Sequence, residues 1–167
     1  ASARETAARV VAGALCKWLM ARLDIQIVSP VAALAPVRAG PDRPPTPQEL
    51  DRIDASEVRC ADADAEQKMI EVIKAAAKAG DSLGGVAEVI AYGVPVGLGS
   101  HVHWDRKLDA LLAQALMSIQ AVKAVEIGDG FDVASRRGSE AHDPIRWDAA
   151  DGAYRPGSGF AGGPREG

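Results

Sequence analysis

The sequence predicts one domain that mixes α-helices and β-strands, on three observations. A length of 167 residues, with 47% hydrophobic and 25% charged residues, suffices for a globular domain with its own core. Apolar residues recur at three- and four-residue spacing over three long stretches, which is typical of amphipathic helices. Short Val- and Ile-rich segments bounded by Gly or Pro lie between these stretches, which is typical of strands.

The first helix is predicted over about residues 3–23. Ser2 and Glu5 have the spacing of a capping box, in which both side chains satisfy backbone N–H groups at the helix start. The apolar positions expected to form one buried face are Ala7, Val10, Val11, Ala14, Leu15, Trp18, Leu19 and Leu23. The next segment, IQIVSPVAAL, predicts a strand that Pro30 bends or ends.

The middle of the chain predicts a loop, two helices and a strand. APVRAGPDRPPT, from Ala35 to Thr46, predicts an exposed loop, and PQELDRID a short helix with Pro47 in its first turn. A long helix is predicted over about residues 62–79 and ends at Gly80. Its inward residues are expected to be Met69, Ile70, Ile73 and Ala77. Glycine pairs in DSLGGVAEVIAYGVPVGLG predict a strand with close backbone neighbours.

The third long helix is followed by an abrupt change of pattern. The apolar stripe of this helix consists of Leu108, Leu111, Leu112, Ala115, Leu116 and Ile119. AVKAVEIG then predicts a strand that stops at Gly-Asp-Gly, and ordinary packing gives no reason for so sharp a junction. Beyond Gly138 the chain is polar and rich in Gly and Pro, so residues 144–167 are expected to form a poorly ordered tail.

Composition narrows the class of protein. A formal net charge of −4 argues against a nucleic-acid-binding protein, which usually carries a basic stripe. No apolar run reaches the roughly 18 residues of a membrane span, so no membrane segment is expected. Cys16 and Cys60 lack metal-site spacing and are expected to be buried free thiols in a cytoplasmic protein. The chain has no initiator methionine and opens on a helix, so we expect it to belong to something longer.

Four motifs suggest chemistry that their sequence context supports only weakly. HVHWD places His101 and His103 on one face of an extended segment, but a third zinc ligand with suitable spacing is missing, which favours a loop. GDSLGG and GVPVGLG match neither glycine-rich phosphate-binding pattern, so close strand packing is the better interpretation. RRGSEAHD contains Ser139, His142 and Asp143 but has no nucleophile-elbow signature.

SARET is the more informative motif. Free N–H groups and the positive end of a helix dipole attract anions at a helix start, and Arg4 adds a full charge there. The alternative is a plain capping box with Arg4 in solvent. The residues alone therefore indicate an anion or cofactor site near a helix start.

Four stretches together resemble the middle of chorismate synthase, in the order and spacing of that family. They are SARETAARVVAGA, GDSLGGVAEVIAYGVPVGLGS, KLDALLAQALMSIQAVKAVEIGDGF and RRGSEAHD. The resemblance covers residues 1–143, the central part of the family's domain, and implies an α+β fold in which antiparallel sheets sandwich helices. It also implies a homotetramer of the full-length protein.

The resemblance further implies an activity. Enzymes of this family eliminate phosphate (1,4 anti) from 5-enolpyruvylshikimate-3-phosphate to give chorismate for aromatic amino-acid biosynthesis, and they require reduced FMN. It leaves open whether a flavin reductase activity, with which NADP is associated, is built in or supplied by another protein. The other interpretation of the chain is a non-enzymatic structural or interaction domain that retained the scaffold.

The resemblance assigns flavin contacts to four residues. The family's Arg-Ser/Ala-Ser motif falls on Ala1 and Ser2, and its amide-alanine pair falls on Gln120 and Ala121. The helix-to-strand junction is thereby interpreted as part of the flavin site, where a large β-branched residue at Ala121 would obstruct the approach. The family's catalytic histidines and aspartate lie outside this chain, so no catalytic residue is assigned here. Ala124 replaces the family's usual glycine in VKGVEIG.

Overall fold

The structure is a computed structural model, and it describes residues 2–40, 44–95, 97–141, 144–150 and 152–156. The chain divides into two compact units. The first unit comprises Ala1–Ala12 and Val94–Gly167, and the second comprises Gly13–Gly93. No described helix is long and apolar enough to cross a membrane.

Helix α1 (Ser2–Ala21) forms where the first helix is predicted, because its alanines and leucines favour helix. The prediction of a buried face is wrong, since Val11 is 66% exposed and Trp18 is 63% exposed. Cys16 is also exposed, contrary to expectation, whereas Cys60 is buried. Apolar spacing identifies the face that gains from burial, but a covering element must come from elsewhere in the fold.

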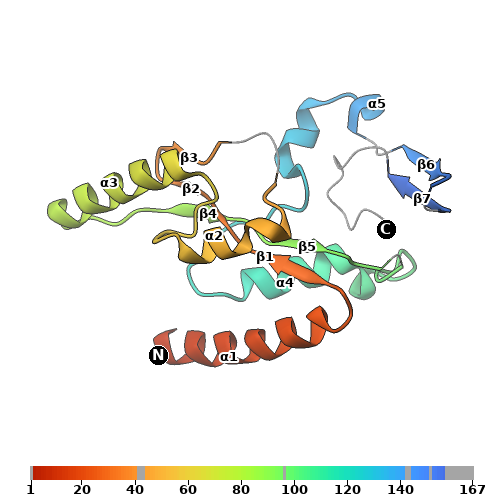
Figure 1. Ribbon diagram of the computed structural model, residues 1–167, viewed down its shortest axis with the longest axis horizontal. Coiled ribbons are helices and arrows are strands. Elements are labelled where there is room, and N and C mark those ends of the chain that lie inside the picture. The colour runs from red at the N-terminus through yellow and green to blue at the C-terminus, as the bar shows by residue number, and fades with distance from the viewer. Residues whose placement is uncertain (1, 41–43, 96, 142–143, 151, 157–167) are drawn as a thin grey trace. The chain divides into compact units, whose positions relative to one another are not determined.

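The second unit contains two antiparallel sheets (Figure 1). Strand β1 (Gln26–Val28) pairs with β5 (Ile90–Tyr92), and β2 (Val31–Leu34) lies between β3 (Val37–Arg38) and β4 (Gly85–Ala87). Pro30 separates β1 from β2 as predicted, because proline cannot donate to a strand ladder. Strand β3 lies inside the stretch predicted to be a loop.

Helices and sheet share one small core in this unit. The 3-10 turn η1 (Pro47–Glu49) and helix α2 (Leu50–Ala55) match the predicted short helix, and α3 (Ala63–Ala79) matches the second long one. Met69 of α3 is fully buried with Cys60 and Ala65, against side chains of β2 and β3. The fully or nearly buried apolar residues of the described chain all lie in this unit: Ile25, Val28, Ala33, Ile53, Cys60, Ala65 and Met69.

The inward face predicted for α3 is only partly correct. Met69 is buried and Ile70 is half-buried, but Ile73 is 39% exposed and Ala77 is exposed. The sheet covers only the first half of the helix, where the buried residues Ala65 and Met69 lie. Burial therefore ends before the apolar pattern of the sequence does.

Asp62 and Gly80 determine the two ends of α3. The Asp62 carboxylate accepts hydrogen bonds from the amides of Asp64 and Ala65 at 2.9 and 3.1 Å. The bond from Ala65, with further backbone bonds from Asp64 and Gly40, lowers the pKa of Asp62 below its usual value against a smaller desolvation effect. Gly80 ends the helix with φ of 69°, as predicted.

Close backbone approach requires glycine beside both sheets, as the glycine-rich segment predicts. A Cβ on Gly93 would lie 2.2 Å from the carbonyl oxygen of Asp24, and φ there is 75°. A Cβ on Gly85 would lie 2.8 Å from the carbonyl oxygen of Ala33. Neither position can take a side chain without moving the neighbouring backbone.

The first unit contains shorter elements. After the 3-10 turn η2 (Trp104–Arg106), helix α4 (Leu108–Met117) matches the third predicted helix, but Leu111 and Leu112 of its apolar stripe are 47% and 45% exposed. The 3-10 helix η3 (Gly130–Ser135) and helix α5 (Gly138–Ala141) follow. Strands β6 (Ile145–Asp148) and β7 (Ala153–Pro156) form a hairpin that the sequence does not predict. The remaining tail, 157–167, lies outside the described residues.

Candidate functional site

Helix α4 ends in a tight turn that carries two of the predicted flavin contacts. Ser118 is the C-terminal capping residue of α4. The amide of Val122 donates a hydrogen bond to the carbonyl of Ile119 at 3.3 Å and closes a four-residue turn, called here the 119–122 turn. Gln120 and Ala121 occupy its two central positions and are both exposed. A side-chain amide and a small residue are thus presented to solvent at adjacent positions.

Ala121 adopts the left-handed backbone region, with φ of 70°. Positive φ at the third position is the property of a type II turn, where glycine is usual. For alanine this conformation costs about 1–2 kcal/mol, and such local strain is concentrated at functional sites. A β-branched residue is the least favourable side chain at this φ; that such a residue would obstruct the flavin stays a prediction.

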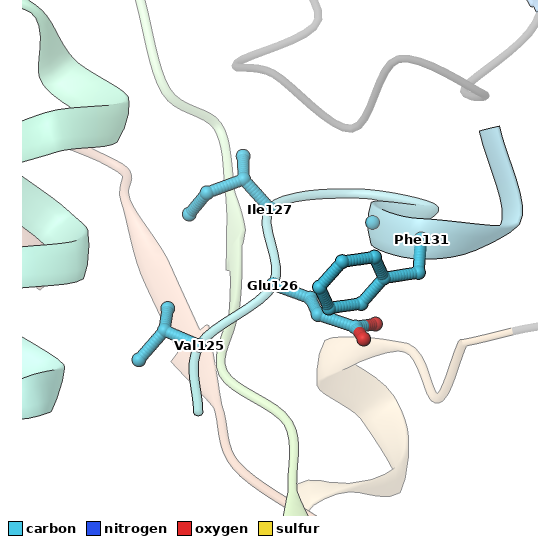
Figure 2. A pocket seen from close by; sticks show the side chains of 5 residues that line it. Val125, Glu126, Ile127 and Phe131 are labelled. Atoms are coloured by element: carbon cyan, nitrogen blue, oxygen red, sulfur yellow. The ribbon is translucent and has the colours of Figure 1, made fainter. Parts of the chain in front are cut away.

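The strand predicted for AVKAVEIG does not form. Residues 122–127 are neither helical nor paired with another strand in the part of the chain that the structure describes. Their side chains still alternate as in a strand, since Val125 and Ile127 point to one side and Glu126 to the other (Figure 2). A period-two pattern sets the faces of a strand, but a ladder also needs a neighbouring strand to exchange hydrogen bonds.

Arg9 connects the first turns of α1 to the end of α4. Its Nε donates to Oε1 of Glu5 at 3.1 Å, and its Nη1 donates to Oγ of Ser118 at 2.9 Å. The Ser118 hydroxyl donates in turn to the carbonyl of Ala115 at 2.7 Å. We call Glu5, Arg9 and Ser118 the Arg9 bridge. It joins residues 109 positions apart in the sequence and was not found by sequence reasoning, because only tertiary structure pairs them.

The bridge connects helix α1 to the end of α4, the two elements on which the predicted flavin contacts lie. Ser2 begins α1, and Arg9 lies seven positions later, about 10 Å along the helix axis. Gln120 follows Ser118 by two residues, at most about 7 Å of chain. Ala1 and the Ser2 side chain lie outside the described residues, so the capping box stays a prediction. Arg4 is exposed, and its role as an anion contact also stays a prediction.

A shallow hollow of about 210 Å³ follows the turn. It is lined by Val125, Glu126, Ile127, Gly130 and Phe131, and the Phe131 ring lies beside the Glu126 side chain (Figure 2). A Cβ on Gly130 would lie 2.5 Å from Oε2 of Glu126, so the second glycine of Gly-Asp-Gly makes room for that carboxylate. The hollow is open, and the Gly-Asp-Gly motif was its only signal in the sequence.

The HVHWD motif, which the structure describes in full, belongs to no ligand cluster of the size a metal needs. His101 and His103 are exposed, and Nδ1 of His103 lies 2.6 Å from Oδ1 of Asp105. Among the described residues, no group of three His, Cys, Asp or Glu side chains could hold a metal ion. His142 and Asp143 lie outside the described residues, so the RRGSEAHD motif stays untested.

Comparison with known proteins identifies the family. The sequence model of chorismate synthase matches residues 1–167. The chain belongs to the chorismate synthase family. It is 60% identical to chorismate synthase of Streptomyces coelicolor over 146 residues, which cover 87% of this chain and 37% of that relative. It is 55% identical to that of Streptomyces avermitilis over 168 residues, which cover 100% of this chain and 42% of the relative.

A solved chorismate synthase crystal structure matches the fold. Its TM-score is 0.86 at 41% identity, and the match covers 97% of this chain and 52% of that chain. The predicted α+β class with antiparallel sheets is thereby confirmed. The chain spans about two fifths of the length of the two Streptomyces chorismate synthases, by the 37% and 42% of their length that it covers.

Proposed function

We propose that this chain forms the central part of a chorismate synthase that eliminates phosphate from 5-enolpyruvylshikimate-3-phosphate to give chorismate. One observation carries the proposal: the family's sequence model matches the chain from residue 1 to residue 167. High identity to named chorismate synthases supports it, at 60% for the Streptomyces coelicolor relative. The catalytic histidines implied by the family lie outside these residues, so this part contributes binding rather than proton transfer.

Reduced FMN is the proposed cofactor, and the donors on this chain fit it. The Gln120 amide can both donate and accept hydrogen bonds, as the polar edge of a flavin ring requires. Ala121 leaves its backbone approachable, because its side chain is a single methyl group. The start of α1 offers free N–H groups to a phosphate, and Arg4 adds a positive charge near it.

These residues act by holding and orienting. When bound, the reduced flavin supplies electron density to the departing phosphate and regains it as the ring hydrogen leaves. Gln120 would orient the ring through its amide, while Ala1 and Ser2 would contact the flavin from the other segment.

The complete gene product that carries this chain tests the activity. Phosphate release and chorismate formation from 5-enolpyruvylshikimate-3-phosphate are expected under anaerobic conditions with reduced FMN, and oxidised FMN serves as the control. The 167-residue chain alone is expected to release no phosphate. A folded complete product that binds neither FMN nor substrate would instead favour a non-enzymatic scaffold.

Three finer properties are part of the proposal. The complete enzyme is a homotetramer, which sedimentation measures directly. It is cytoplasmic, in agreement with the free thiols of Cys16 and Cys60, and cell fractionation tests this. NADP is associated with it only if flavin reduction is built in; reduction of FMN by NADPH in the purified enzyme, without a second protein, decides that point.

A further inference from the structure

The 119–122 turn has little internal support. One long backbone hydrogen bond, 3.3 Å from Val122 to Ile119, closes it, and Ala121 at its third position has an unfavourable φ of 70°. Its central residues are exposed, so packing does not hold them. A binding group on such a turn is positioned accurately only when a neighbouring element anchors it.

The Arg9 bridge is that anchor. Ser118 directly precedes the turn, and its hydroxyl already donates to the carbonyl of Ala115, which leaves its lone pairs free to accept from Arg9. The Arg9 guanidinium has a second donor, which Glu5 occupies one helical turn earlier on α1. The fork geometry of arginine allows both contacts at once, whereas a lysine ammonium on this stem cannot reproduce them.

Glu5 and Arg9 of the bridge lie on one face of α1. Positions 2, 5 and 9 are separated by three and four residues and therefore follow one another along one helix face. The face of α1 that carries Glu5 and Arg9 is thus the face that reaches Ser118. From these contacts we infer that Arg9 is a positioning residue, which holds the 119–122 turn in register with the start of α1 so that one FMN contacts both.

This inference rests on the proposed function and is tested in the complete gene product by FMN titration. Arg9→Gln and Ser118→Ala are each expected to weaken FMN binding about fivefold, the effect of losing a partly exposed, charge-assisted hydrogen bond. The double variant should be no weaker than either single variant, because both remove the same contact. Ser118→Thr, which keeps the hydroxyl, should restore most of the affinity.

Ser135 provides a matched control. Its hydroxyl donates to the carbonyl of Asp132 at 2.8 Å. The Ser118 hydroxyl likewise donates to the carbonyl three positions earlier, that of Ala115. Ser135→Ala should leave FMN affinity unchanged, and melting temperatures should agree across all variants. The positioning role is overturned, and the proposed function stands, if both single variants bind FMN as tightly as wild type. The same holds if the losses of the two single variants add in the double variant. If wild type binds no FMN and releases no phosphate, both fail.

Discussion

Replacing Ala121 by glycine is expected to stabilise the protein. At φ of 70° the Ala121 Cβ is close to the following carbonyl oxygen, which costs about 1–2 kcal/mol. Glycine removes this cost. It also gives the unfolded chain more conformational freedom, which lowers the free energy of unfolding by about 0.4–1 kcal/mol. The net gain in the free energy of unfolding is therefore about 0.8 kcal/mol at the middle of these ranges. Ala121→Val should lose about 1–2 kcal/mol, because a β-branched residue at positive φ is strained further.

Ala124 is the matched control. It is an exposed alanine in the same segment, and it is not one of the described non-glycine residues with positive φ. Ala124→Gly should lose about 0.4–1 kcal/mol, so the same chemical change has opposite signs three residues apart. Urea unfolding followed by circular dichroism measures this. With a slope of about 1–3 kcal/mol per M, Ala121→Gly should raise the midpoint by about 0.2–1 M. Equal decreases for both glycine variants would refute the assigned strain.

Three further predictions concern the second unit. Gly93→Ala should lower the free energy of unfolding by about 2–4 kcal/mol, because its Cβ would lie 2.2 Å from the Asp24 carbonyl oxygen. Gly80 has a similar φ but nothing within 4 Å of its Cβ position, so Gly80→Ala should lower it by about 1 kcal/mol. Equal thermal destabilisation of the two variants would contradict the steric argument. Met69→Ala should lose about 2–5 kcal/mol in urea unfolding because Met69 is fully buried, and Ile73→Ala, 39% exposed, should lose less than half as much. The lowered pKa of Asp62 means that its carboxylate contributes stability above its unfolded pKa, which is lost as pH falls through the folded value. Asp62→Asn keeps a capping oxygen but removes the titrating carboxylate, so the urea midpoint should fall less steeply as pH is lowered. An unchanged dependence of the midpoint on pH would contradict this assignment to Asp62.

Local sequence determined most of the helices, because their signals lie within a few residues of one another. Asp62 and Gly80 mark the ends of α3 through their own hydrogen-bonding and backbone preferences. Pro30 separates β1 from β2 for the same kind of reason. The predicted flavin contacts at Gln120 and Ala121 likewise rest on a local motif of the family.

Only tertiary structure decided which apolar faces are covered and which strands find partners. Val11 and Trp18 have the spacing of a core face yet are exposed, and Val125 and Ile127 alternate like a strand yet have no ladder in the described chain. No local sequence pattern indicates the hydrogen bond between Arg9 and Ser118 or the positive φ of Ala121. Burial, pairing and long-range hydrogen bonds depend on groups remote in sequence, whereas helix caps and turn breakers depend on neighbours.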